Sequence, residues 1–243
     1  PRSVIELGVA GKLDCLDGVL FPAICDVIRN LSGMWKMLFS DKYVKYMDFP
    51  QNFEQAGRVY YREEMEQMVR DFEQMTGNEI SNEDLNRSIE LYNENRQAVR
   101  ELYDLRAKLP HLVLTYELYL LMRASNILEV SEHTQMLQEY MQEVVKLERP
   151  LRDHVRVVVT GAFCEQPPLS LVRALENSGC FIVDDDWVLT NRYQLKDTLQ
   201  SDDALGSIID SYLSDTVATA SRYEEGDNKG EYLVIVHKYS QKD

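Results

Sequence analysis

The order of apolar and polar residues in the first 50 positions predicts a small α/β layer. Apolar residues recur at helical spacing from Ser3 to Lys12 and again from Asp26 to Phe39. A short apolar run from Leu16 to Pro22 lies between them and is typical of a strand, and a further strand is expected after the second helix. This alternation favours parallel strands covered by helices, and it is interrupted at Asp48-Phe49-Pro50, where the proline disfavours helix at the residue before it.

Residues 51–150 have a different pattern, that of long charged helices with one apolar face. The first helix is expected to break at Gly77, and Ser81 with Asp84 has the spacing of a capping box at the start of the next helix. Ser131 is expected to cap a later helix. We interpret this part of the chain as a helical subdomain. The apolar stripe of its first helix comprises Tyr60, Met65, Met68, Val69 and Phe72.

The α/β pattern returns after Pro150. His154–Thr160 holds four valines and reads as a buried strand, Leu169–Asn177 as a helix, and Cys180–Val183 as a second strand. Two further helical stretches are expected in the polar remainder, at residues 202–213 and 230–242. The sequence therefore predicts an α/β protein with two Rossmann-like parallel-sheet lobes, residues 1–50 and 151–243, both incomplete and separated by the helical subdomain.

The charge of the chain argues against several classes of partner. Its 26 basic side chains are outnumbered by 41 acidic ones, giving a formal net charge of -15, so nucleic acid and anionic membrane surfaces are not expected to bind. No apolar stretch approaches the roughly 20 residues that span a bilayer, and no signal peptide is recognisable. We expect a cytoplasmic location. The first residue is not Met, and both ends fall within helical patterns, which suggests a fragment of a longer chain.

Two cysteines follow predicted strands, where ligands bind in parallel α/β sheets. Cys25 comes after the first strand and directly before a helix, whose N-terminal partial charge favours an anion such as a thiolate. Cys164 stands in the same relation to the valine-rich strand. Either residue could instead be a small buried hydrophobe. Cys15 and Cys180 are interpreted as structural, and the wide spacing of the cysteines argues against a disulfide framework.

Three adjacent carboxylates, Asp184-Asp185-Asp186, follow the last predicted strand. They could hold a cation or a polar network, but a solvated turn with one capping Asp is the commoner explanation of such a run. The histidines lack the spacing of metal ligands and do not adjoin a nucleophile, and neither a dinucleotide fingerprint nor a P-loop is present. Composition and motifs alone therefore leave the activity open.

Two segments resemble the benzoyl-CoA reductase and 2-hydroxyacyl-CoA dehydratase family. The first is Leu16–Arg29, which is similar to the family's strand, ligand-cysteine and helix motif. The second, more specific one runs from the Phe-Cys-Glu-Gln-Pro-Pro loop at residues 163–168 to the Val-Asp-Asp-Asp turn at residues 183–186. The helical insert between them also fits the family layout, so the resemblance covers nearly the whole chain.

The resemblance implies a heteromeric oxidoreductase that acts on coenzyme A thioesters with a [4Fe-4S] cluster held by cysteines. It also implies a second homologous subunit, and a separate ATP-hydrolysing iron-sulfur activator that supplies single electrons at low potential. Cys25 matches a cluster ligand, and Cys164 lies in a loop expected near the cluster, as an additional ligand or an active-site residue. Glu165 could donate or relay a proton to a radical anion if burial raises its pKa.

Three functions remain open at this point. The loop at residues 163–168 favours the branch that reduces the aromatic ring of benzoyl-CoA, and the nearest alternative is a 2-hydroxyacyl-CoA dehydratase subunit that works through a ketyl radical. The third is a non-catalytic scaffold that docks the catalytic subunit. A cluster needs about three or more cysteine ligands, and the further ones are expected before Pro1 and after Asp243, so the chain alone is expected to be inactive.

Overall fold

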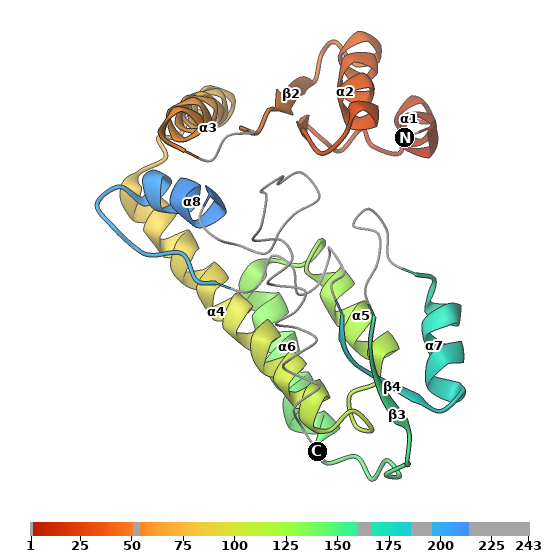
Figure 1. Ribbon diagram of the computed structural model, residues 1–243. Helices are drawn as coiled ribbons and strands as arrows, with labels where there is room; N and C mark the ends of the chain where they lie inside the picture. Colours follow the sequence, from red (N-terminus) through yellow and green to blue (C-terminus); the bar gives the residue numbers. More distant parts are fainter. Residues whose placement is uncertain (1, 51–53, 160–166, 186–195, 214–243) are drawn as a thin grey trace. The chain divides into compact units, whose positions relative to one another are not determined.

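The computed structural model describes residues 2–50, 54–159, 167–185 and 196–213 (Figure 1). Contacts divide the chain into two compact units, residues 1–79 and residues 80–243. Each unit contains one pair of parallel strands, and the two units are described separately below.

The first unit is built around a strand-helix-strand motif. Its strands β1 and β2 pair in parallel, with Gly18 opposite Tyr43 and Pro22 opposite Met47. Because parallel neighbours need a crossover connection, the helix α2 joins the two strands. The elements of this unit are α1 (Arg2–Val9), β1 (Gly18–Pro22), α2 (Asp26–Leu38), β2 (Tyr43–Met47) and α3 (Gln55–Thr76).

Aromatic packing forms the core of this unit. Phe21 of β1 and Trp35 of α2 are buried with ring centroids 6.1 Å apart, and Phe39 lies 4.6 Å from Trp35. Gly8 of α1 completes the contact, since a Cβ atom there would come within 2.7 Å of the Phe39 ring. The absence of a side chain at Gly8 therefore lets α1 approach the aromatic rings.

The helix α3 is tied to β2 by a partly buried polar contact. The hydroxyl of Tyr43 donates a 2.6 Å hydrogen bond to Oδ2 of Asp71. Burial and the neighbouring carboxylate both raise the pKa of Tyr43, so the phenol stays protonated and remains a donor. Gly77 ends α3 in the left-handed conformation, with φ at 71°, as the sequence predicted.

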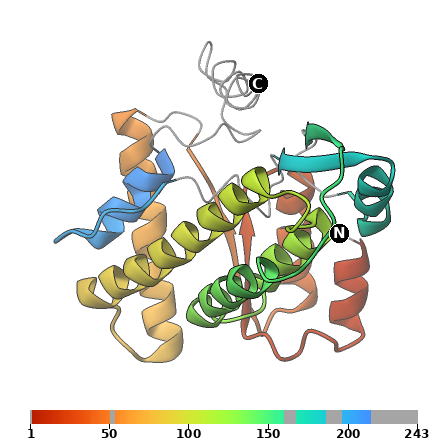
Figure 2. The same ribbon diagram turned by 90° about the horizontal axis from the view of Figure 1, so that it is seen from below.

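The second unit packs long helices around one apolar core. Its helices α4 (Asn82–Lys108) and α6 (Val130–Val144) lie side by side, as the yellow and green ribbons of Figure 2 show. The helix α5 (Thr115–Ala124) packs against α6. The buried apolar residues of this core are Ala98, Val99, Leu102, Tyr103, Leu112, Val113, Leu118, Met122, Leu137 and Val144.

A second strand-helix-strand motif lies beside these helices (Figure 1). The strands β3 (Val155–Val159) and β4 (Cys180–Asp185) are parallel and are connected through α7 (Leu169–Asn177). Their register shifts by one residue, because Val157 pairs with Ile182 whereas Val158 pairs with Asp184. The extra residue, Val183, makes a bulge in β4.

The N-cap residues of α4 and α6 can be compared with the caps predicted from the sequence. Ser81 caps α4 in a complete capping box, since its hydroxyl accepts from the Asp84 amide and the Asp84 side chain accepts from the Ser81 amide. The assignment of Ser131 as a cap was wrong. The cap of α6 is Glu129, whose Oε2 accepts from the amide of Ser131 at 2.9 Å, because the longer carboxylate reaches the free amides of the first turn.

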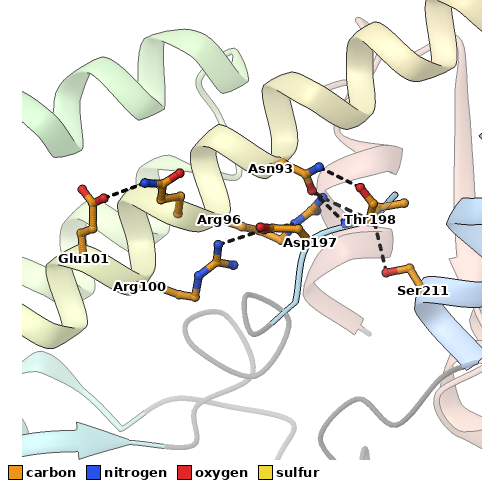
Figure 3. Close-up of polar contacts among 8 residues, drawn as sticks. Asn93, Arg96, Arg100, Glu101, Asp197, Thr198 and Ser211 are labelled. Atoms are coloured by element: carbon orange, nitrogen blue, oxygen red, sulfur yellow. Dashed lines mark hydrogen bonds and ion pairs between the residues drawn. The ribbon is translucent and has the colours of Figure 1, made fainter. Parts of the chain in front are cut away.

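Polar side chains on α4 fix the segment that leads into α8 (Ala204–Leu213). Figure 3 shows Asn93 and Arg100 of α4 reaching toward Thr198 and Asp197. Asn93 bonds both backbone groups of Thr198, donating to its oxygen at 2.8 Å and accepting from its amide at 2.9 Å. Arg100 adds an ion pair of 2.9 Å to Asp197. The amide side chain of Asn93 thus satisfies the backbone N–H and C=O of Thr198, as a neighbouring strand would do in a sheet.

The mixed α/β class and the parallel pairing predicted from the sequence are confirmed. The division into lobes at residues 1–50 and 151–243 with a helical subdomain between them stays a prediction. The expected helix at residues 230–242 lies outside the described residues. Within the described ranges, no helix has both the length and the hydropathy of a membrane span.

Candidate functional site

The carboxyl edge of the β1–β2 pair carries Cys25. Pro22 and Met47 end the two strands side by side, and the amide of Ala23 continues the pairing by donating to the Met47 oxygen at 2.9 Å. Cys25 follows as the N-cap of α2, in an extended conformation with φ at -168°. Its side chain is exposed and makes no capping hydrogen bond, so the sulfur is left available for another partner.

Other functional groups lie at the same edge. Arg29, one helical turn after Cys25, places its guanidinium 5.8 Å from the ring centre of Tyr46, and the contact with that tyrosine raises the pKa of Arg29. Asp48 follows β2, and its carboxylate accepts a hydrogen bond of 3.2 Å from the Tyr60 hydroxyl. A sulfur, a cation and a carboxylate therefore come from the residues that follow or flank the two strand ends.

The carboxyl edge of the β3–β4 pair is organised by a buried ion pair. Asp184 and Asp185 belong to β4 and are 5% and 2% exposed. Nη2 of Arg106 donates to Oδ2 of Asp185 at 2.9 Å and lies 3.8 Å from Asp184. The expectation of a solvated turn was wrong for these two residues, because α4 supplies a cation that compensates their burial. Asp186 lies outside the described residues.

Tyr103 is the third member of this buried polar group, beside Arg106 and Asp185. Its hydroxyl donates to Asp185 at 3.2 Å, and its ring centre lies 4.4 Å from the guanidinium carbon of Arg106. Burial alone would lower the pKa of Arg106, but Asp185, Tyr103 and Asp184 together outweigh burial and raise it. Nε and Nη1 of Arg106 find no hydrogen-bond partner among the residues that the structure describes.

The group formed by Arg106, Asp185 and Tyr103 lies at the end of the strand pair whose first strand, β3, precedes the loop at residues 163–168. Val159, the last residue of β3, pairs with Asp185, and five positions separate it from Cys164 along the chain. Cys164 and Glu165 themselves lie outside the described residues. Arg106 was not predicted from the sequence, although a signal exists: an arginine three positions after Tyr103 on the apolar face of α4 needs a buried anion.

A [4Fe-4S] cluster requires several protein ligands, and the described residues can be compared with this requirement. Within residues 2–50, 54–159, 167–185 and 196–213, no three His, Cys, Asp or Glu side chains gather as a metal site would require. Cys25 fits one ligand position by its exposure and its free sulfur. The described residues therefore do not by themselves form the ligand set of a [4Fe-4S] cluster.

Comparison with known proteins identifies the family. The family model described as 2-hydroxyglutaryl-CoA dehydratase, D-component, matches residues 1–241. One of the benzoyl-CoA reductase subunits of Thauera aromatica is 44% identical over 236 residues, which are 96% of this chain and 61% of that protein. Lactoyl-CoA dehydratase subunit beta of Anaerotignum propionicum is 30% identical over 83% of this chain and 53% of that protein.

A more distant relative is (R)-phenyllactyl-CoA dehydratase beta subunit of Clostridium sporogenes, which is 22% identical over 100% of this chain and 64% of its own length. The chain belongs to the 2-hydroxyglutaryl-CoA dehydratase D-component family, with both reductase and dehydratase subunits among its relatives. It spans between about half and two thirds of the length of the relatives that it matches.

Proposed function

We propose that this chain is part of a subunit of an oxidoreductase that reduces the aromatic ring of benzoyl-CoA or a related aromatic acyl-CoA. The observation that carries the proposal is the 44% identity to a benzoyl-CoA reductase subunit across 96% of the chain. The dehydratase subunits reach 22% and 30%. The markedly higher identity to the reductase subunit favours the reductase branch.

Cys25 is proposed as a ligand of a [4Fe-4S] cluster in the intact assembly. The support is its place at the carboxyl edge of two parallel strands, with an exposed sulfur that takes no part in capping the helix. A bound cluster supplies single-electron transfer at low reduction potential. The remaining ligands would come from Cys164 or from the longer protein and its partner.

Metal analysis of the full-length subunit tests this role. The protein is purified anaerobically, and iron and acid-labile sulfide are measured for the parent, for Cys25→Ser and for Cys15→Ser. Cys15 is a matched control, because it is also an exposed, free cysteine of the first unit. We expect Cys25→Ser to lose most of the iron and Cys15→Ser to keep it. Equal iron in all three proteins would remove Cys25 from the ligand set.

The reaction is tested on the complete complex. The assay combines this subunit, its homologous partner and the ATP-hydrolysing iron-sulfur activator, with benzoyl-CoA and a 2-hydroxyacyl-CoA as separate substrates. Formation of a cyclic diene from benzoyl-CoA supports the proposal. Dehydration of the hydroxyacyl thioester would instead assign the second candidate, which the dehydratase relatives favour. If the complex turns over while this subunit contains no iron-sulfur cluster, the subunit acts as a non-catalytic scaffold.

Glu165 is proposed to donate or relay a proton to the reduced substrate. The support is its place in the sequence beside Cys164, after a strand whose end pairs with Asp185, the partner of Arg106. A carboxyl group donates a proton efficiently only when its pKa approaches the working pH. A Glu165→Gln variant is expected to lose most of its turnover while retaining iron. Full turnover of that variant would discard the role.

A further inference from the structure

A pocket of about 400 Å³ lies in the second unit at the edge opposite the Arg106–Asp185 pair. Its lining includes Cys180, the first residue of β4, and His154, which directly precedes β3, so it lies at the amino ends of the parallel strands. The volume is within the range of small-molecule sites. The function proposed above makes no use of this pocket.

Three guanidinium groups line this pocket, from two separate stretches of chain. Arg149 and Arg152 lie in the connection from α6 to β3, and Arg173 lies on α7. This concentration of positive charge contrasts with the formal net charge of -15 for the chain. Charged side chains gathered around a pocket raise the local concentration of ligands with the opposite sign.

The three arginines differ in their partners. Arg149 is neutralised by Glu117, to which it donates two hydrogen bonds of 2.7 and 2.9 Å. Arg152 and Arg173 form no ion pair with a residue of the described chain. Glu176, the acidic side chain of the lining, already accepts a hydrogen bond of 2.8 Å from the amide of Thr115. Within the described residues, both guanidinium groups can therefore donate to a ligand, although the charge of Glu176 offsets one of their two charges.

Aromatic rings form part of the wall. The guanidinium of Arg173 lies 5.1 Å from the ring centre of Tyr116, and the rings of His154 and Phe181 are 4.7 Å apart. Stacking on an aromatic face restricts the freedom of an arginine and reduces the entropy that it loses on binding. The rings also offer apolar surface to the part of a ligand that is not charged.

We infer that this pocket binds a small phosphorylated molecule, whose phosphate is held by Arg152 and Arg173. A phosphate monoester carries between about 1.5 and 2 negative charges at neutral pH and presents three acceptor oxygens, which both guanidinium groups can share. A carboxylate carries one charge and two oxygens, so the same two guanidinium groups attract it less strongly. Planar guanidinium groups also form paired hydrogen bonds to phosphate oxygens.

Calorimetric titration of the full-length protein tests the inference directly. The probe is phenyl phosphate, which combines one aromatic ring with one phosphate, and benzoate is the control with the same ring and a single charge. Inorganic phosphate and pyrophosphate are titrated as well. We expect phenyl phosphate to bind at least about tenfold more tightly than benzoate, since hydrogen bonds between charged groups contribute most. Absence of binding for all three phosphates would overturn the inference.

Variants locate the binding. Arg152→Ala and Arg173→Ala are each expected to weaken phenyl phosphate binding about tenfold or more. Arg123→Ala is the matched control, because Arg123 also lies over a tyrosine, at 5.9 Å from the ring of Tyr119, but does not line the pocket. Unchanged affinity in both pocket variants, or an equal loss in the control, would contradict the inference.

Cys180 provides a second measurement that does not depend on variants. Its thiol is free and it lines the pocket, so bound phenyl phosphate should slow its alkylation by a thiol reagent. Cys15, an exposed cysteine of the other unit, serves as the internal control. Mass spectrometry distinguishes the two sites. Alkylation of Cys180 at the same rate with and without saturating ligand would place the binding elsewhere and overturn the inference.

Discussion

Arg106 and Asp185 form a buried ion pair of 2.9 Å across 79 positions of sequence. Arg106 belongs to the long helix α4 and Asp185 ends the strand β4, so this contact joins the helical core to the carboxyl edge of the β3–β4 pair. Both side chains are withdrawn from solvent. The pair thereby fixes the end of the strand from which the candidate site of the second unit begins.

Removal of one partner of this pair should destabilise the protein strongly. Asp185→Ala leaves Arg106 charged and buried, and the loss of a single partner of a buried pair costs about 3–5 kcal/mol. The double variant Arg106→Met with Asp185→Leu removes both charges and should be more stable than Asp185→Ala alone. Urea unfolding measures the free energies. Lys146→Ala, which breaks a solvent-exposed pair with Glu143, is the control and should have little effect.

Gly8→Ala should destabilise the first unit by about 1–3 kcal/mol, the usual cost of overpacking a filled core. The added methyl group would lie 2.7 Å from the Phe39 ring and 3.0 Å from Trp35. Gly33→Ala is the matched control in the neighbouring helix α2, where no heavy atom lies within 4 Å of the new Cβ. That variant should be neutral or stabilising by up to about 1 kcal/mol. Thermal unfolding compares them, and equal melting temperatures would refute the prediction.

His133 should make the protein less stable as the pH falls below about 6.5, the usual pKa of histidine. Nδ1 accepts from Asn95 at 2.8 Å and Nε2 donates to the Leu121 oxygen at 3.0 Å, so the buried ring is held neutral. Burial lowers its pKa in the folded state, and below the ordinary pKa the unfolded state binds the additional proton. The contribution to stability is therefore present above about pH 6.5 and is lost progressively at lower pH.

The measurement is the free energy of unfolding between about pH 8 and about pH 5.5, for the parent protein and for His133→Gln. The parent should lose stability with a slope that approaches about 1.4 kcal/mol per pH unit from this residue. The variant lacks the titrating ring and should have a smaller slope, even though it is less stable at every pH. If the free energy of unfolding varies with pH equally in the parent and the variant, His133 does not determine the pH dependence of stability.

Asn93→Ala should loosen the segment at residues 196–203 while α4 remains folded. The substitution removes both hydrogen bonds between the Asn93 side chain and the backbone of Thr198, which together contribute about 1–3 kcal/mol. Hydrogen exchange should become faster in this segment and in α8. Gln97→Ala is the control, since Gln97 lies on the same helix and its side chain bonds to the exposed side chain of Glu101. Faster exchange in the control would indicate a general effect on α4.

The helices and strands were largely predictable because their signals are local. The apolar run before Cys25, the capping box at Ser81 and the glycine at Gly77 each depend on residues within a few positions of one another. The first residue of α6 was not found, since Ser131 and Glu129 both carry oxygen acceptors and only the backbone path decides which one caps. Local patterns specify the elements more reliably than their ends.

The candidate sites were predictable only in part. The position of Cys25 between a strand and a helix was predicted from local patterns and is confirmed, whereas its role as a cluster ligand stays a prediction. The burial of Asp185 was missed because the cation that permits it is 79 positions away. The arginine-lined pocket was missed for the same reason, since Arg149 and Arg173 come together only through the fold. Contacts between distant residues leave little trace in a single sequence.

The extra residue in β4 has a consequence for comparing or recombining members of the family. Without the bulge at Val183, Val158 would face Val183 instead of Asp184, and the side chains beyond that point would exchange faces of the strand. Deletion of Val183 would instead close the bulge and leave Asp184 and Asp185 opposite their present partners, Val158 and Val159, with Asp185 still on the side of Arg106. Chimeric subunits must therefore either keep the bulge or shorten this strand by one residue, so that Asp185 stays opposite Val159.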